Sequence, residues 1–238
     1  MPIVDCRFEQ RRFIALAPND MVGAMSLNWD FSTVADRLGE GITAVEAELR
    51  LEQAVYGLDA RDELAIQAVL GERLREHYEV AREVHYPSST GRKLTHRQRC
   101  DLVLSPKGRP LKLDRTSPTL FDPPNLCPPG EALWLEVKIA YQFREGGARH
   151  GGYGAQWRTA VVDDLRKMEA EEQIREAGLL LIVFNESREI LDKDLDLFET
   201  VLAQQEVLAG FRQVRSVPIL DRIGHQLCTA ALWPTLQR

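Results

Sequence analysis

The segment ALWLEVKI, residues 132–139, ends in an alternation of apolar and charged side chains. Because successive side chains of a β-strand point to opposite faces, we expect Leu135 and Val137 on one face and Glu136 and Lys138 on the other. The two charged groups would then project together, about 6 to 7 Å apart along the strand. Such a pair indicates either a cross-strand salt bridge on an exposed face or a functional site.

A second strand-like segment, QRCDLVL at residues 98–104, carries one carboxylate, that of Asp101. Carboxylates are disfavoured in strands and are costly to bury without a partner. If the two segments pair, Asp101 can face Glu136, and two converging carboxylates supply the oxygen ligands that Mg²⁺ prefers. Lys138 beside them could hold or deprotonate an attacking water, so the set suits phosphodiester hydrolysis.

Helical and strand patterns alternate on both sides of these segments. Three consecutive strands favour a meander, and a later helix–strand step favours a crossover, so we expect an α/β (α+β) fold with a mixed sheet flanked by helices. Residues 1–60 are interpreted as an N-terminal extension, 61–238 as the main domain, and the proline-rich stretch 106–130 as an insertion. Periodicity predicts helices at about 43–57, 61–77, 155–176 and 190–208, and strands at 78–87, 98–104, 132–139, 178–185, 211–220 and 225–233.

The whole chain has 238 residues, of which 44% are hydrophobic and 28% charged, and a net charge of -6. Length and composition fit one domain with extensions. Since no apolar run approaches the roughly 18 residues that cross a bilayer, we expect no membrane partner. The four cysteines lie far apart, which indicates neither a zinc site nor a disulfide framework, and a reducing cytoplasm is the expected location.

Residues 91–115 carry a local excess of positive charge, with eight basic side chains against two acidic ones. This charge fits either a phosphate-binding face or a solvated loop. A glycine run at 146–154 could flex over a substrate, and two further arginines in and beside it could contact phosphate. The candidate nucleic-acid contacts are Arg92, Lys93, Arg97, Arg99, Arg144 and Arg149.

Asp101, followed by Glu136-Val137-Lys138 in an order of helix, three strands, helix and strand, resembles the PD-(D/E)xK nuclease superfamily over about residues 61–185. The resemblance implies a restriction-endonuclease-like core of order αβββαβ, here with an extra C-terminal helix and strands. It implies Mg²⁺- or Mn²⁺-dependent cleavage of nucleic acid, with DNA as the expected substrate. It also implies that Asp101, Glu136 and the Val137 carbonyl bind the metal, and that Lys138 serves the attacking water.

Three features depart from the superfamily pattern. Cys100 stands where the motif has proline. The long gap between the two acidic residues of the motif requires residues 106–130 to loop out. A Gln-x-x-x-Tyr element, present in some members, is absent here because Gln156 is followed four residues later by Ala160.

Superfamily members often add a glutamate from the first helix, and helix phase ranks the candidates. The apolar stripe of the expected helix 61–77 includes Glu63, with Gln67 beside it, whereas Glu72 and Glu76 lie on the opposite face. Glu63 is therefore the expected fourth site residue and a metal ligand, and Gln67 a supporting residue. The alternative is that Glu63 only stabilises the positive N-terminal end of its helix.

Two other carboxylates are candidates for supporting roles. Asp164 falls on the inward stripe of the expected helix 155–176, where it could contact the site or a buried basic partner. Glu83, in the first strand, could support the metal ligands or be an edge-strand charge. Asp163 and Lys167 are expected to turn away as an i,i+4 surface pair.

The sequence leaves three functional classes open. The leading interpretation is a nuclease that acts on DNA. The second is a non-catalytic nucleic-acid-binding or interaction module of the same fold, and the third is an RNA-cleaving enzyme. A homodimer is compatible with each of them, and the segment 190–238 could form its surface.

Overall fold

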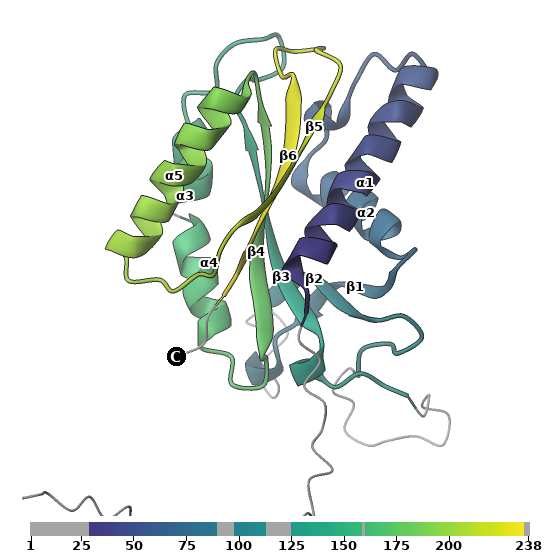
Figure 1. Ribbon diagram of the computed structural model, residues 1–238, viewed down its shortest axis with the longest axis vertical. Helices are drawn as coiled ribbons and strands as arrows, with labels where there is room; N and C mark the ends of the chain where they lie inside the picture. Colours follow the sequence, from purple (N-terminus) through teal and green to yellow (C-terminus); the bar gives the residue numbers. More distant parts are fainter. Residues whose placement is uncertain (1–28, 90–97, 113–124, 159, 236–238) are drawn as a thin grey trace, which may run out of the picture.

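The computed structural model describes residues 29–89, 98–112, 125–158 and 160–235. A six-stranded sheet lies between two layers of helices (Figure 1). The elements in chain order are α1 (Phe31–Leu51), the 3-10 turn η1 (Leu58–Ala60), α2 (Glu63–Leu74), β1 (Tyr78–His85), β2 (Arg99–Pro106), β3 (Leu133–Tyr141), α3 (Tyr153–Arg158), α4 (Ala160–Glu169), β4 (Glu176–Asn185), α5 (Arg188–Gln204), β5 (Gln213–Pro218) and β6 (Leu227–Pro234).

The sheet is mixed, with strand order β1-β2-β3-β4-β6-β5. β3 and β4 run parallel, and every other neighbouring pair is antiparallel. The parallel step needs a crossover connection, which α3 and α4 provide. The expected meander of three strands followed by a crossover is therefore confirmed, and the fold class is α/β with a mixed sheet flanked by helices.

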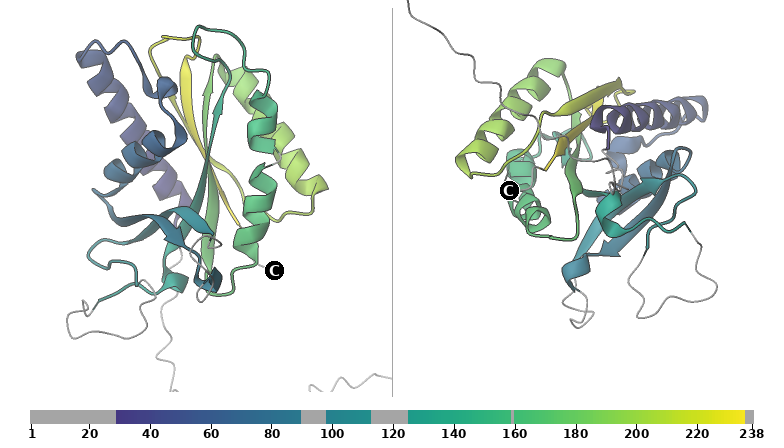
Figure 2. Two further views of the ribbon diagram at one scale, coloured as in Figure 1. Left: turned by 180° about the vertical axis from the view of Figure 1, so that it is seen from behind. Right: turned by 60° about the horizontal axis from the view of Figure 1, so that its bottom comes forward.

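The two faces of the sheet bury separate apolar cores. On one face, leucines and isoleucines of α1 and α2 pack against Leu135 and Val137 of β3. On the other face, α3, α4 and α5 pack against Trp134 of the same strand. Figure 2 shows these helix layers on opposite sides of the sheet. The strand parity inferred for residues 132–139 is thus confirmed, and Glu136 and Lys138 belong to the α4 side.

The first helix differs from the expected one. We predicted a helix at about 43–57, but α1 begins at Phe31 and ends at Leu51. Asp30 is the N-cap residue of α1, and its side-chain carboxylate accepts a hydrogen bond from the Ser32 N–H. Residues 1–42 are poorly periodic and hold several small or turn-prone residues, which predicts no helix before 43. Two of these residues, Gly39 and Gly41, lie where α1 passes close to neighbouring side chains. A Cβ at Gly41 would lie 2.9 Å from the Cβ of Arg73.

The helix predicted at 155–176 is also corrected. α4 ends at Glu169, and β4 already begins at Glu176, so the chain turns before the expected end of the helix. The segment from 153 to 169 is divided into two helices, α3 and α4. The remaining predicted helices and strands coincide with observed elements to within a few residues at each end.

The predicted insertion 106–130 joins β2 to β3. Its two ends meet, because the Cys127 N–H donates to the Pro110 carbonyl and the Lys112 N–H donates to the Cys127 carbonyl. Residues 113–124 lie outside the described part of the chain. Within the described ranges, no helix combines the length and apolar character needed to span a membrane.

Candidate active site

Asp101 and Glu136 lie side by side where β2 and β3 meet. The register pairs Leu102 with Leu135. At the next position Asp101 turns its carboxylate toward β3, and its Oδ2 accepts a hydrogen bond of 2.7 Å from the Val137 N–H. β2 and β3 therefore pair, as the approach of Asp101 to Glu136 requires. Burial raises the pKa of Asp101, although the Val137 N–H and the Lys138 charge oppose that shift.

Glu136 is a buried carboxylate with two hydrogen-bond donors. Its side chain is 3% exposed. The Lys167 Nζ lies 2.7 Å from its Oε1, and the Tyr86 hydroxyl donates to the same oxygen. Burial and the neighbouring charge of Asp101 raise the pKa of Glu136 to about 7, in spite of these two donors. Burial therefore keeps Glu136 partly protonated near neutral pH.

Lys138 projects from the same face of β3 and pairs with α4. Its Nζ lies 3.1 Å from Asp164 Oδ2. Burial alone would lower the pKa of Lys138, but the carboxylates of Asp164, Asp101 and Glu63 together outweigh burial and raise it. Lys138 is therefore held as an ammonium group, a hydrogen-bond donor, rather than as a neutral amine.

Glu63 is the first residue of α2, after the N-cap residue Asp62. Desolvation raises its pKa, the Lys138 charge lowers it, and the carboxylates of Asp164 and Glu136 raise it again. Glu63 is therefore close enough to Lys138, Asp164 and Glu136 for their charges to change its pKa. The end of the helix and the two strands therefore bring four of the predicted residues into one region.

The supporting candidates have different positions. Asp164 bridges the two lysines, at 3.1 Å from Lys138 and 3.3 Å from Lys167, as expected for an inward carboxylate with basic partners. Gln67 is buried in α2, and its Oε1 has no hydrogen-bond partner among the described residues. Glu83 is exposed and lies 3.7 Å from Arg99, with a positive φ of 53°.

Lys167 and Tyr86 are site residues that the sequence did not predict. We expected Lys167 to pair with Asp163 at the surface, and this was wrong: Asp163 pairs with Arg166, whereas Lys167 turns inward to Glu136. The available signal was the i,i+3 spacing from Asp164, which places both side chains on one helix face. The Lys167 Nζ also lies 5.0 Å from the centre of the Tyr86 ring.

The proposed nucleic-acid contacts are described only in part. Arg92, Lys93 and Arg97 lie outside the described residues. Arg144 is exposed on the loop after β3. Arg149, on the same loop, lies 2.8 Å from Glu186.

Carboxylates outnumber ammonium groups in this region. Four carboxylates, those of Asp101, Glu136, Glu63 and Asp164, lie around two ammonium groups, which leaves two negative charges uncompensated when all are ionised. Carboxylate oxygens with an excess of negative charge are the kind of ligands that Mg²⁺ binds. Within the described ranges, no group of three or more His, Cys, Asp or Glu side chains is arranged to hold a metal ion. The fit therefore rests on the adjacent Asp101 and Glu136.

Comparisons with known proteins add no relative of this chain. Neither the models of protein families, nor the curated proteins, nor the solved structures contain a match to it.

Proposed function

We propose that this protein is a metal-dependent nuclease of the PD-(D/E)xK type that hydrolyses phosphodiester bonds of DNA. The observation that carries the proposal is the juxtaposition of Asp101, Glu136 and Lys138 on adjacent strands, with the Asp101 carboxylate bound to the Val137 N–H. The element order α2-β1-β2-β3-α3-α4-β4 supports it, because it resembles the αβββαβ order of that superfamily with the second helix divided in two.

Each residue has a role that follows from its position. Asp101 and Glu136, with the Val137 carbonyl, would hold Mg²⁺ or Mn²⁺, and Glu63 would act on the ion through its charge alone. The bound ion would polarise the phosphoryl oxygen and lower the pKa of an attacking water. Lys138, kept protonated by Asp164, would donate a hydrogen bond that orients the water or the phosphate oxygen. The structure thus favours an orienting role for Lys138 over the role of a base.

The test is a cleavage assay with plasmid, linear duplex, single-stranded DNA and RNA, each with Mg²⁺, Mn²⁺ or EDTA. We expect metal-dependent cleavage of DNA that Lys138→Ala and Glu136→Ala reduce by at least about a hundredfold. Lys193→Ala is the matched control, because Lys193 is an exposed lysine of α5. Circular dichroism should show that the variants remain folded. Cleavage that persists unchanged in both site variants would refute the site, and cleavage of RNA alone would refute the substrate.

The ion pair between Lys167 and Glu136 favours one alternative, a binding module of the same fold without catalysis. Lys167 places an ammonium group on the carboxylate that a metal would bind. If that ion pair is permanent, the protein would bind nucleic acid in EDTA as tightly as in Mg²⁺ and would cut none of the four substrates. A binding titration in EDTA and in Mg²⁺, run beside the cleavage assay, therefore separates the two functions.

A further inference from the structure

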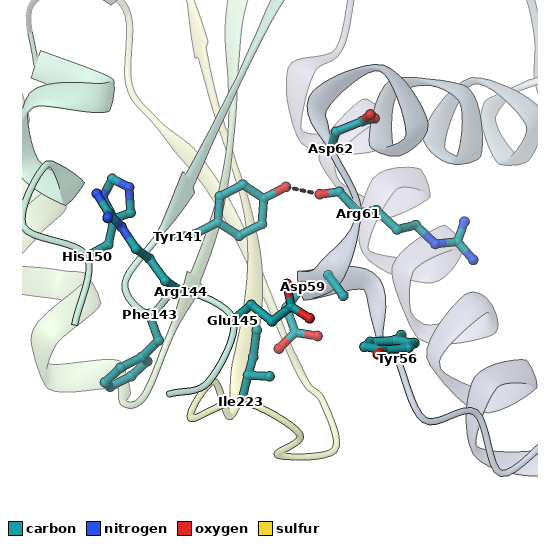
Figure 3. A pocket seen from close by; sticks show the side chains of 12 residues that line it. Tyr56, Asp59, Arg61, Asp62, Tyr141, Phe143, Arg144, Glu145, His150 and Ile223 are labelled. Carbon is teal, nitrogen blue, oxygen red and sulfur yellow. Dashed lines mark hydrogen bonds between the residues drawn. The ribbon is translucent and has the colours of Figure 1, made fainter. Parts of the chain in front are cut away.

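A cavity of about 800 Å³ lies on the other face of β3 from Lys138, and Tyr141 and Arg61 are among the residues that line it. Figure 3 shows the Tyr141 side chain directed toward Arg61, whose carbonyl accepts a hydrogen bond from the Tyr141 hydroxyl. Tyr141 packs with the apolar face of β3 that α1 and α2 cover. Because Lys138 points to the opposite face, we expect further cationic contacts with a phosphate at Lys138 from the α4 side.

α4 brings a second ammonium group to that side. The Lys167 Nζ lies 2.7 Å from Glu136 Oε1 and 3.3 Å from Asp164 Oδ1. The Lys167 side chain is 19% exposed, so its ammonium group is partly buried against the site without being sealed from a ligand. The roles proposed above for Asp101, Glu136 and Lys138 give this lysine no function.

Asp164 holds the two lysines beside each other. Its Oδ2 lies 3.1 Å from the Lys138 Nζ, and its Oδ1 lies 3.3 Å from the Lys167 Nζ. Two ammonium groups at such short range repel each other, and the carboxylate between them offsets that repulsion. Lys167 follows Asp164 by three residues in α4, so helix geometry keeps both side chains on one face. Asp164 therefore keeps two cationic hydrogen-bond donors together on the α4 side of β3.

Two adjacent ammonium groups suit an anion that has several oxygens. A phosphodiester carries one negative charge and two free oxygens, so it can accept hydrogen bonds from both lysines. An ammonium group has three donors that rotate to meet such oxygens. A phosphate held by an ion at Glu136 and by Lys138 would lie over β3, on the face that α4 covers. Lys167 approaches the same position from α4.

The ion pair with Glu136 must loosen before Lys167 can contact a phosphate. A divalent ion and an ammonium group on one carboxylate repel each other, so an ion at Glu136 weakens the pair with Lys167. Asp164 retains the side chain, because its own contact with Lys167 does not involve Glu136. Lys167 thus exchanges the Glu136 carboxylate for the phosphate, and its ammonium group keeps anionic partners throughout.

We propose that Lys167 is a second phosphate-binding residue of this site. When a divalent ion binds Glu136, Lys167 stays on Asp164 and joins Lys138 on the phosphate that is cut. This inference rests on the proposed nuclease function and adds to it a second cationic contact, with Asp164 as the residue that positions both lysines.

The experiment measures how strongly salt weakens binding to a short labelled DNA duplex, by fluorescence anisotropy in Ca²⁺ and in EDTA. Ca²⁺ takes oxygen ligands, as Mg²⁺ does. The logarithm of the association constant falls linearly with the logarithm of the salt concentration, with a slope of about −0.9 for each phosphate contact. We expect Lys167→Met to make this slope shallower by about 0.9 in Ca²⁺ and to weaken binding about tenfold, and to leave both unchanged in EDTA.

Two further variants make the result specific. Lys167→Arg keeps the positive charge and should keep the wild-type slope in Ca²⁺. Lys193→Met is the matched control, because Lys193 is an exposed lysine of α5, and it should change neither slope. Circular dichroism should show that all three variants are folded.

The outcomes separate this inference from the nuclease proposal. If Lys167→Met and the wild type have equal slopes in Ca²⁺ while the wild type cuts DNA in Mg²⁺, the inference is overturned and the nuclease proposal stands. If Lys167→Met makes the slope equally shallower in EDTA, Lys167 contacts DNA without metal, and the exchange at Glu136 is refuted. If the wild type cuts nothing in Mg²⁺ while the difference in Ca²⁺ is observed, Lys167 binds phosphate as proposed and the nuclease proposal fails.

Discussion

At the scale of the residue, the unusual feature is a buried glutamate that titrates near neutrality. Burial and the charge of Asp101 raise the pKa of Glu136 from 4.5 to about 7. The folded protein therefore binds a proton more tightly at this position than the unfolded chain does. The resulting stabilisation is complete below about pH 4.5 and is lost as the pH rises through about 7.

We predict that Glu136→Gln removes this pH dependence. In EDTA, the wild-type melting temperature should fall relative to that of Glu136→Gln as the pH is raised from about 5 to about 8. Mg²⁺ should raise the melting temperature of the wild type, increasingly above pH 7, and should have no effect on the variant. Thermal melts over a pH series measure both effects. Parallel curves for the two proteins in EDTA would contradict the assignment of the raised pKa to Glu136.

We predict that Lys167 competes with the metal for Glu136. The Lys167 Nζ lies 2.7 Å from Glu136 Oε1. Lys167→Met removes the competing charge and keeps an unbranched side chain, so Mg²⁺ should raise the melting temperature of this variant more than that of the wild type. Arg166→Met, at the exposed neighbouring position, is the control and should behave as the wild type does. A smaller Mg²⁺ effect in Lys167→Met would show that Lys167 supports the site.

The residue scale also shows which site residues a sequence can reveal. Strand parity placed Glu136 and Lys138 together because the period of a strand is two, and no other information was needed. The contacts of Lys167 and Tyr86 with Glu136 depend on how α4 packs on the sheet and on where the chain runs after β1. The pattern of a single helix or strand does not predict that packing. Long-range packing therefore decided the two site residues that the sequence did not predict.

At the scale of the element, the neighbours of β4 leave little room at Gly178. Gly178 lies in β4 opposite Pro234 of β6. A Cβ at this position would lie 2.7 Å from the Trp233 carbonyl oxygen and 2.9 Å from a ring carbon of Phe31. The glycine thus permits the close approach of β6 and α1 to β4.

We predict that Gly178→Ala destabilises the protein by about 1–3 kcal/mol, because backbone atoms and a packed ring must move. Gly151→Ala is the matched control, since a Cβ there meets no described atom within 4 Å. That variant should be neutral or slightly stabilising, by up to about 1 kcal/mol. Denaturant unfolding measures both changes. Equal stability of the two variants would contradict the packing described for β4.

The element scale explains why α1 was misplaced in the sequence. Poor periodicity and several small or turn-prone residues before Thr43 predict irregular structure there, since such residues lower helix propensity. In the fold, a Cβ at Gly39 would approach Arg215 of β5 to 3.1 Å, so the glycine allows close contact between helix and sheet. Tertiary packing often overrides helix propensity, and it does so here, because α1 begins at Phe31 in spite of these residues.

At the scale of the whole molecule, α1 and the C-terminal strands complete one core. Val34, Leu38 and Ile42 of α1 belong to the same buried cluster as Leu232 of β6 and Val217 of β5. A buried ion pair adds to this connection, because Arg222, after β5, lies 3.4 Å from Glu46 of α1. The helix that the sequence assigned to an N-terminal extension thus packs into the same core as the strands from the end of the chain.

We predict that Leu38→Ala lowers the stability of the entire protein. Leu38 is 1% exposed, and the loss of its side chain should cost about 2–5 kcal/mol and shift a single cooperative transition. Leu51→Ala is the control within the same helix, since Leu51 is 86% exposed, and it should change stability by no more than about 0.5 kcal/mol. The measurement is chemical unfolding followed by both helical circular dichroism and tryptophan fluorescence. If α1 folded separately from the sheet, Leu38→Ala would leave the main fluorescence transition in place and move only part of the helical signal.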